Sequence, residues 1–113
     1  MYSKIRVFLY DDDNNKFFGE GPYELLCGVE QTGSLHKAAI SMHMAYTKAL
    51  AIIKQAEKSL GFPLTTTKVG GNGGGGSQLT KQAKEFLHDY ETYRNACVEA
   101  NRRIYNEIYS NKQ

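Results

Sequence analysis

Residues 34–60 read SLHKAAISMHMAYTKALAIIKQAEKSL, and the pattern of this segment predicts two consecutive helices. It opens on Ser34, a residue type that caps helices, and apolar residues follow at helical spacing: Leu35, Ala38 and Ala39. The pattern predicts a short helix that starts after Ser34 and does not run far past Ile40.

A longer helix is predicted for residues 45–60. Its apolar residues fall on one face, and they are Ala45, Ala49, Ile52, Ile53, Ala56 and Leu60. Gly61 and Pro63 then end the helix. The short segment 41–44 separates the two helices, and the small residues of the first allow close approach. This arrangement meets the requirements of a helix-turn-helix.

Toward the N-terminus the sequence predicts a hairpin and one more helix. Ile5, Val7 and Leu9 alternate with polar or aromatic residues, as in a half-buried strand, and residues 11–15 supply a turn before a second strand at residues 16–18. The turn contains three Asp residues, but Lys16 and Pro22 stand where a calcium loop needs Gly and Glu, so a plain turn is favoured.

A helix over residues 22–32 is expected to follow this hairpin. Gly21 and Pro22 suit its cap and first position, and Gly33 suits its left-handed end.

Toward the C-terminus, residues 64–69 and 77–79 are short extended stretches around a block in which six of seven residues are glycine, residues 70–76. A nucleotide-binding loop would need a Lys before Ser77, and a flexible linker would need an independent core beyond it. The favoured interpretation is a wing, a hairpin whose tip lies against nucleic-acid backbone. Thr80 then caps a final helix over residues 81–109, whose apolar stripe is longer than a small domain can cover.

Composition narrows the class of protein. The chain has 113 residues, enough for one domain, with ordinary hydrophobic content and no apolar run long enough for a membrane span or a secretory signal, so we expect a single cytoplasmic domain, residues 1–113. Cys27 and Cys97 lack the spacing of a metal site or redox pair and are expected to be buried and reduced.

The charge is uneven along the chain. Residues 34–68 carry five Lys and one Glu, whereas residues 1–33 carry three basic and six acidic residues. The middle third is therefore expected to be the cationic surface.

The outward face of the helix over residues 45–60 carries Thr47, Ala51, Lys54 and Lys58, flanked by Lys48 and Gln55. Small side chains near its start would let it enter a major groove, where Thr47 and Lys48 reach base edges and the later lysines neutralise phosphates. A solvated lysine face is the plainer alternative, but the glycine-tipped hairpin favours nucleic acid.

Several motifs together make a family resemblance. They are Thr32-Gly33-Ser34-Leu35, the Ala38-Ala39 pair, Met42-x-Met44-x-Tyr46 and the glycine block before Leu79-Thr80. From residue 18 to about 93 the chain resembles the N-terminal domain of ModE-type molybdate-responsive transcription regulators, and more distantly the DNA-binding domain of LysR-type regulators. The resemblance implies a mainly α fold with small β hairpins (α+β), a dimeric winged helix-turn-helix with a long C-terminal dimerisation helix.

The expectation is therefore sequence-specific binding of double-stranded DNA as a homodimer. The expected DNA-binding residues are Ser34, His36, Tyr46, Thr47, Lys48, Ala51, Lys54, Lys58, Lys68, Gly71, Asn72, Gly73 and Ser77. The expected dimer contacts are Tyr90, Tyr93, Cys97, Ala100, Ile104 and Ile108.

Departures from the family pattern modify this expectation. His43 replaces a usual Gly and Ala45 a usual capping Ser, at a cost of about 1 kcal/mol for the cap. A basic residue of the family pattern is replaced at two positions, by Thr47 and by Asn72, and a Trp is replaced by Leu50. These changes predict fewer phosphate contacts and a changed base preference. The family's oxyanion-binding domains follow the long helix, so no molybdate site is expected within residues 1–113.

Other function classes have weaker support. An enzyme would have to use His36, His43, His88, the cysteines and scattered carboxylates, none of which has catalytic or metal-ligand spacing, so neither an enzyme nor a cofactor is expected. A degenerate winged helix that dimerises through its tyrosine-rich last helix and binds another regulator remains the alternative. RNA binding lacks an exposed aromatic platform on strands.

Overall fold

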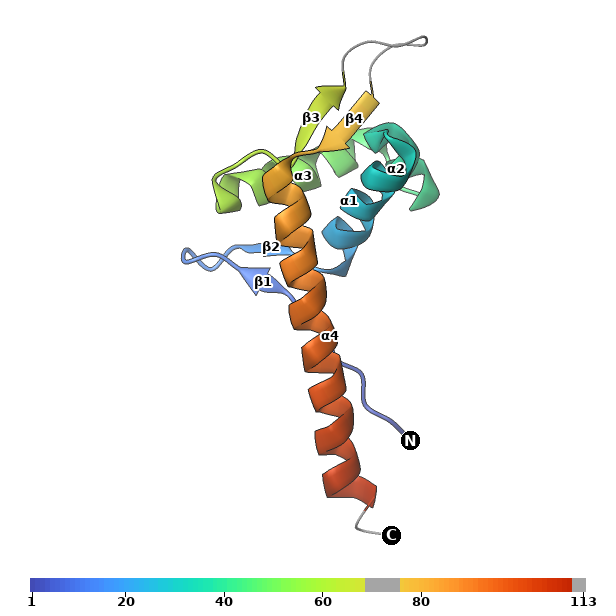
Figure 1. Cartoon of the computed structure of the whole chain (residues 1–113), viewed down its shortest axis with the longest axis vertical. Helices are drawn as coiled ribbons and strands as arrows, with labels where there is room; N and C mark the ends of the chain where they lie inside the picture. The colour runs from blue at the N-terminus through green and yellow to red at the C-terminus, as the bar shows by residue number, and fades with distance from the viewer. Residues whose placement is uncertain (69–75, 111–113) are drawn as a thin grey trace.

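The computed structural model describes residues 1–68 and 76–110, and in these residues four helices and two antiparallel hairpins are present (Figure 1). The mixed α+β class is thus confirmed. The elements are β1 (Leu9–Tyr10), β2 (Lys16–Phe18), α1 (Glu20–Thr32), α2 (Leu35–Ser41), α3 (Tyr46–Leu60), β3 (Thr65–Lys68), β4 (Gly76–Leu79) and α4 (Lys81–Tyr109).

One hydrophobic core joins the three short helices, the hairpins and the first part of α4. Its largest fully buried side chains are Phe18, Leu25, Leu26, Ile53, Leu64 and Val29. The ring of Phe18 makes edge contacts with Phe86 and Tyr90, with centroids 4.8 and 4.9 Å apart. These contacts fix α4 against the rest of the core. We call the folded body that surrounds this core, from β1 to Tyr90 of α4, the head.

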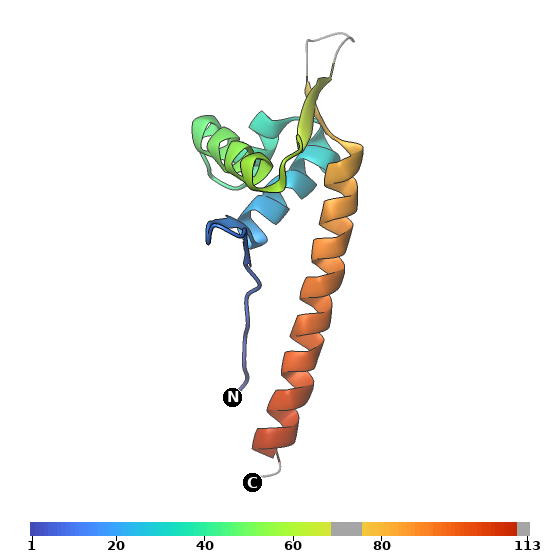
Figure 2. The ribbon, with the colours of Figure 1, turned by 90° about the vertical axis from the view of Figure 1, so that its left-hand side faces the viewer.

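The second half of α4 projects from the head as a stem, residues 93–109 (Figures 1 and 2). The molecule accordingly measures 62 × 30 × 24 Å. Buried residues on α4 stop at Tyr90. None of the helices in the described ranges combines the length and the hydrophobicity needed to span a bilayer.

The N-terminus differs from the prediction, because strand pairing begins at Leu9 and not near Ile5. Residues 1–8 belong to no strand, and they run beside α4 (Figure 2). Tyr90 donates its hydroxyl to the carbonyl oxygen of Val7 at 2.8 Å, so a contact with a helix takes the place of a strand partner. The alternation of Ile5, Val7 and Leu9 correctly predicts extended backbone, but its prediction of a paired strand from Ile5 is wrong.

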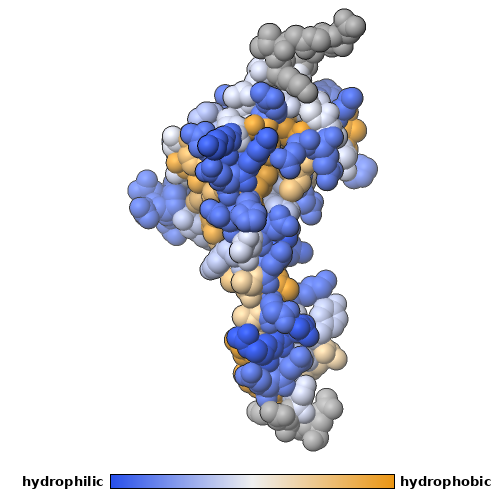
Figure 3. Space-filling model, viewed as in Figure 1, coloured by the Kyte–Doolittle hydropathy of each residue, from blue (hydrophilic) through white to orange (hydrophobic). Residues whose placement is uncertain are grey.

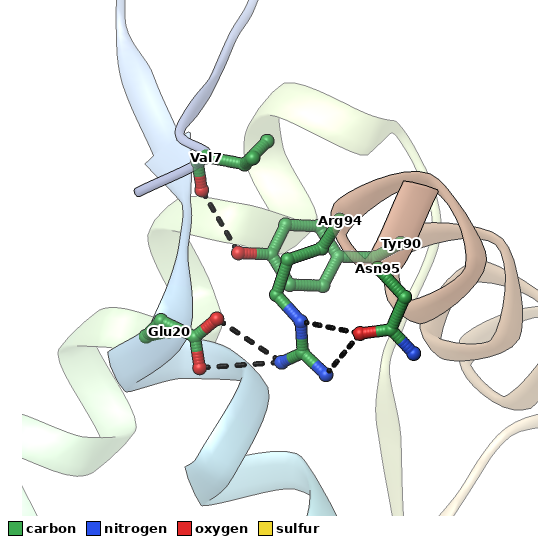
Figure 4. A network of polar contacts seen from close by, with 5 residues as sticks. All are labelled: Val7, Glu20, Tyr90, Arg94 and Asn95. Carbon is green, nitrogen blue, oxygen red and sulfur yellow. Dashed lines mark hydrogen bonds and ion pairs between the residues drawn. The ribbon is translucent and has the colours of Figure 1, made fainter. Parts of the chain in front are cut away.

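The helix α1 begins at Glu20, two residues earlier than expected. Pro22 is compatible with this start because it lies in the first turn, where a backbone N–H has no partner within the helix. Glu20 also meets α4, since its carboxylate forms an ion pair with Arg94 at 3.0 Å (Figure 4). The predicted end of α1 at Thr32 is correct, with Gly33 in the left-handed region at φ 71°.

The connection between α2 and α3 is a tight turn stabilised by backbone hydrogen bonds. Met42 and Met44 both donate their N–H groups to the carbonyl of Ala39, at 3.1 and 2.9 Å. His43 takes the left-handed conformation that glycine usually supplies, with φ 55°. Ala45 is the N-cap of α3 and offers no side-chain acceptor. It is exposed, so its predicted place on the buried face was wrong.

The two cysteines are free, and both are half-buried where full burial was expected. Burial raises the pKa of the Cys27 thiol.

Candidate nucleic-acid interface

The outward face of α3 is exposed along its length, and its residues are Thr47, Lys48, Ala51, Lys54, Gln55 and Lys58. The opposite face is anchored in the core through Ala49, Ile53 and Ala56. Glu57 is the acidic residue of this helix, and its carboxylate accepts the backbone N–H of Leu64 at 2.7 Å. With Glu57 engaged at the start of the hairpin, the exposed face of α3 carries lysines and no acidic side chain.

The hairpin of β3 and β4 is held against the helices at two places. Near its far end, Ser77 donates its N–H to the carbonyl of Gly33 at 2.8 Å. At its base, Thr80 donates its N–H to the carbonyl of Leu64 at 3.0 Å and its hydroxyl to that of Pro63 at 2.7 Å. The hairpin therefore has a fixed position relative to α2 and α3.

Gly76 lies close to the backbone between α1 and α2. A Cβ atom at Gly76 would lie 2.4 Å from the carbonyl oxygen of Gly33. Any larger residue would push β4 away from the junction of α1 and α2. Glycine is required here for space between two backbones.

A polar groove of about 210 Å³ separates α3 from the hairpin. Its lining includes Tyr46, Lys54 and Glu57, whose carboxylate accepts the N–H of Leu64, and three consecutive threonines of β3, Thr65, Thr66 and Thr67. Hydroxyls and an ammonium group on facing walls are suited to phosphate oxygens. The threonines were missed by the sequence reasoning, although three β-branched polar residues in a row beside a wing were the available signal.

His36 of α2 and Tyr46 of α3 stack on one another, with ring centroids 5.6 Å apart and an interplanar angle of 26°. Both side chains are exposed. Ser34 starts the same helix as His36, and its hydroxyl accepts the N–H of Lys37 at 3.1 Å. The structure thus brings Ser34, His36 and Tyr46 to the side of the molecule where α3 begins.

The other end of α3 meets an acidic turn. Asp11 accepts a hydrogen bond from the hydroxyl of Ser59 at 2.7 Å, and Lys58 lines one hollow together with Asp11, Asp12 and Asp13. Hydrogen bonds from the backbone of Asn15 and from Ser59 lower the pKa of Asp11. Lys58 therefore borders an acidic surface, which the sequence pattern did not reveal.

Some predicted residues lie outside this description. Gly71, Asn72 and Gly73 fall beyond the described residues, as does the side chain of Lys68. Ser77 is half-buried on β4 and lines the groove beside α3.

A second surface lies on the stem. Tyr93, Ile104 and Ile108 are exposed there, and Cys97 and Ala100 are half-buried. Tyr90 was expected in the same group, but only 2% of it is exposed because Phe18 and Tyr23 pack against its ring. Tyr90 is a core residue of the head.

No protein-family model matches the sequence. The chain is similar to the molybdenum transport protein ModE of Herbaspirillum seropedicae, with 33% identity over 87 residues, covering 65% of this chain and 32% of that protein. The chain thus spans about a third of the length of this curated relative.

Proposed function

We propose that the protein is a transcription regulator that binds double-stranded DNA in a sequence-specific manner. In this proposal α2 and α3 form a helix-turn-helix, β3 and β4 form the wing, and residues 1–113 act as a single domain. The observation that carries it is the lysine-bearing face of α3 beside a hairpin held at a fixed distance by the bond between Ser77 and Gly33. Similarity to ModE supports the same class of protein.

The mechanism assigns different roles to residues along α3. Thr47 and Lys48 lie in the first turn, enter the major groove and contact base edges, with Ala51 small enough to allow close approach. Lys54 neutralises a phosphate together with the threonines across the groove. The stacked pair of His36 and Tyr46 contacts the backbone next to the helix start.

A two-part operator requires two copies of the chain, and the stem is the surface through which we propose that they meet. Tyr93, Ile104 and Ile108 present apolar surface that the head does not cover. We propose that two stems pair, with Cys97 and Ala100 at the contact, so that two α3 helices enter successive major grooves about 34 Å apart.

Selection of bound duplexes from a random DNA pool tests the proposal. The selected site is then titrated by fluorescence anisotropy at several salt concentrations. Lys54→Ala is expected to weaken all sequences alike and to lower the salt slope by about 0.9. Thr47→Ala is expected to relax preference at one position by about 1–3 kcal/mol.

Lys84→Ala is the matched control, because Lys84 is an exposed lysine of α4. It is expected to leave affinity and salt slope unchanged. Retention of no duplex at low salt would refute DNA binding and would favour the alternative, a module that binds another regulator. Equal effects of the Thr47 and Lys54 substitutions would refute the division of roles.

A further inference from the structure

A hollow of about 190 Å³ lies between the hairpin of β1 and β2 and the helices α1 and α3. The hairpin and the residue before it supply three aromatic side chains, Phe8, Phe17 and Phe18. Helix α3 supplies Ile52 and Gln55, and the start of α1 forms the remaining wall. Figure 3 shows hydrophobic surface on the head beside the hydrophilic end of this hairpin.

Two glycines at the start of α1 shape one wall of the hollow. A Cβ atom at Gly19 would lie 2.7 Å from the Cδ1 atom of Phe8, so the Phe8 ring lies directly against the backbone there. A Cβ atom at Gly21 would meet nothing within 4 Å. This wall therefore presents backbone, to which Pro22 adds a rigid ring. Backbone without side chains lets a flat ligand approach closely.

The aromatic walls are held in place by the core. Phe17 and Phe18 both contact Phe86 of α4, with ring centroids 6.4 and 4.8 Å apart. Only 1% of Phe18 is exposed. The hollow is thus formed before a ligand arrives, as small-molecule sites usually are. Its walls favour an aromatic ligand, because aromatic rings make offset or edge contacts with one another.

The charge in the lining is positive. Lys16 is the one ionisable side chain among the described residues that line the hollow, and its Nζ atom lies 4.8 Å from the centroid of the Phe8 ring. The side-chain amide of Gln55 donates to the carbonyl of Lys16 at 3.4 Å, a long distance for a hydrogen bond, so this amide is able to turn toward a better acceptor. The aspartates at residues 11–13 line a different hollow. An ammonium group and an amide N–H beside aromatic walls suit a carboxylate.

The volume limits the ligand to one ring. A cavity of about 150 Å³ lined by apolar side chains holds a benzene molecule, so the hollow has room for one ring with a short substituent. We propose that it binds a small aromatic carboxylate, with the ring against Phe8, Phe17 and Ile52 and the carboxylate on Lys16 and Gln55. This site lies within the head, so it depends neither on the proposed DNA binding nor on the proposed dimer.

Such a ligand contacts the hairpin and α3 at the same time. Ile52 and Gln55 are neighbours along α3 of Ala51 and Lys54, which lie on its exposed face. The ligand adds to the bonds of Gln55 and Ser59 that already link α3 to the hairpin. The site therefore gives a small molecule a direct contact with the helix for which we propose DNA recognition.

Nuclear magnetic resonance titration of the full chain with sodium benzoate, at constant ionic strength, tests the proposal. The backbone amide signals of Gly19, Gly21 and Ile52 and the side-chain amide signals of Gln55 are expected to shift and to saturate together. Benzamide has the same ring without the charge, and it is expected to bind about fivefold more weakly.

Three variants locate the ligand. Lys16→Met is expected to weaken benzoate binding about fivefold and to leave benzamide binding unchanged, because only the charged ligand loses a partner. Gly21→Leu places a side chain where Gly21 leaves open space, and it is expected to abolish saturable binding of both ligands. Lys84→Met, at an exposed lysine of α4, is the matched control and is expected to change neither affinity.

The same spectra establish that each variant is folded. Shifts that spread over the whole surface and grow in proportion to benzoate concentration would overturn the site. Equal affinities for benzoate and benzamide, or an equal loss of both in the Lys16 variant, would overturn the placement of the carboxylate. Unchanged binding in the folded Gly21→Leu variant would show that the ligand lies elsewhere.

Discussion

At the scale of single residues, the start of α3 lacks the side-chain acceptor that caps α2 and α4. Ala45 already has the extended conformation of an N-cap, with φ −64° and ψ 144°. Ala45→Ser therefore needs no change of backbone and is expected to stabilise the fold by about 1 kcal/mol. At a fixed protein concentration, thermal unfolding should show Tm rising by about 4 °C or more.

The control for this prediction is Ala51→Ser, the same exchange at an exposed position inside α3. There a serine side chain cannot cap, and its lower helix propensity should reduce Tm slightly. A gain at both positions would show that the cap is not the cause.

Tyr23 links the stability of the head to alkaline pH. Burial, followed by a hydrogen bond with Cys27, raises the pKa of Tyr23 from 10.0 to about 12. Between these values the unfolded chain loses the phenol proton and the folded chain keeps it. The contribution of Tyr23 to the free energy of unfolding is thus complete below pH 10, and it is lost as the pH rises toward 12.

Tyr23→Phe is expected to flatten the decline of the unfolding free energy over pH 10 to 12, measured by urea unfolding at each pH. Some decline remains, because burial also raises the pKa of Tyr90. Tyr10→Phe, at an exposed tyrosine, should decline as the wild type does. A wild-type slope in the Tyr23 variant would contradict the assignment.

At the scale of elements, the position of the wing depends on one glycine. Gly76→Ala places a Cβ atom against the carbonyl of Gly33, and the resulting backbone shift is expected to cost about 1–3 kcal/mol. In the proposed complex DNA affinity should fall with it, because the wing is displaced from its position at the junction of α1 and α2. Gly21→Ala is the control, since its Cβ would meet nothing within 4 Å, and it should leave Tm equal or higher. Tm and anisotropy titrations measure both effects.

The acidic turn is expected to oppose the proposed DNA binding at the far end of α3. Asp12→Asn combined with Asp13→Asn removes two negative charges beside Lys58. A charge about 10 Å from a phosphate contributes about 0.4 kcal/mol in water, so DNA affinity should rise about twofold per charge at low salt. Asp89→Asn on α4 removes one charge elsewhere and should have no effect. An equal gain from Asp89→Asn would attribute the change to net charge alone.

Sequence patterns predicted the elements better than their connections. Ser34, Gly33 and Thr80 fixed helix ends because caps and left-handed positions depend on neighbours a few residues away. The bond from Asp11 to Ser59 spans 48 positions, and no local periodicity reports it. The same reason explains why the close approach of Gly76 to Gly33 was missed. Tyr90 was misassigned because a helical stripe does not reveal where the covering residues end.

At the scale of the whole molecule, the proposed dimer predicts that DNA affinity depends on the spacing between the two half-sites. Insertion of five base pairs between the halves of the selected site turns one half to the opposite face of the duplex. The dimer should then bind about as weakly as it binds a single half-site, as measured by anisotropy. Ile108→Asp, which charges the stem stripe, should lose the advantage of the two-part site while keeping affinity for a half-site. Equal affinity for both spacings would exclude a rigid dimer that contacts both half-sites at once.

The length of α4 beyond the head gives the molecule a lever. The buried residues of α4 stop at Tyr90, and from Tyr93 to Tyr109 the helix extends about 24 Å, with Ser3 of the N-terminal segment bonded to Asn101. A tilt of about 10° where the helix leaves the head displaces its far end by about 4 Å. In the proposed dimer, small rearrangements of the Glu20, Arg94 and Tyr90 contacts are thereby converted into larger changes in the separation of the two heads. The spacing between the halves of the proposed operator then depends on an angle that is set away from α3.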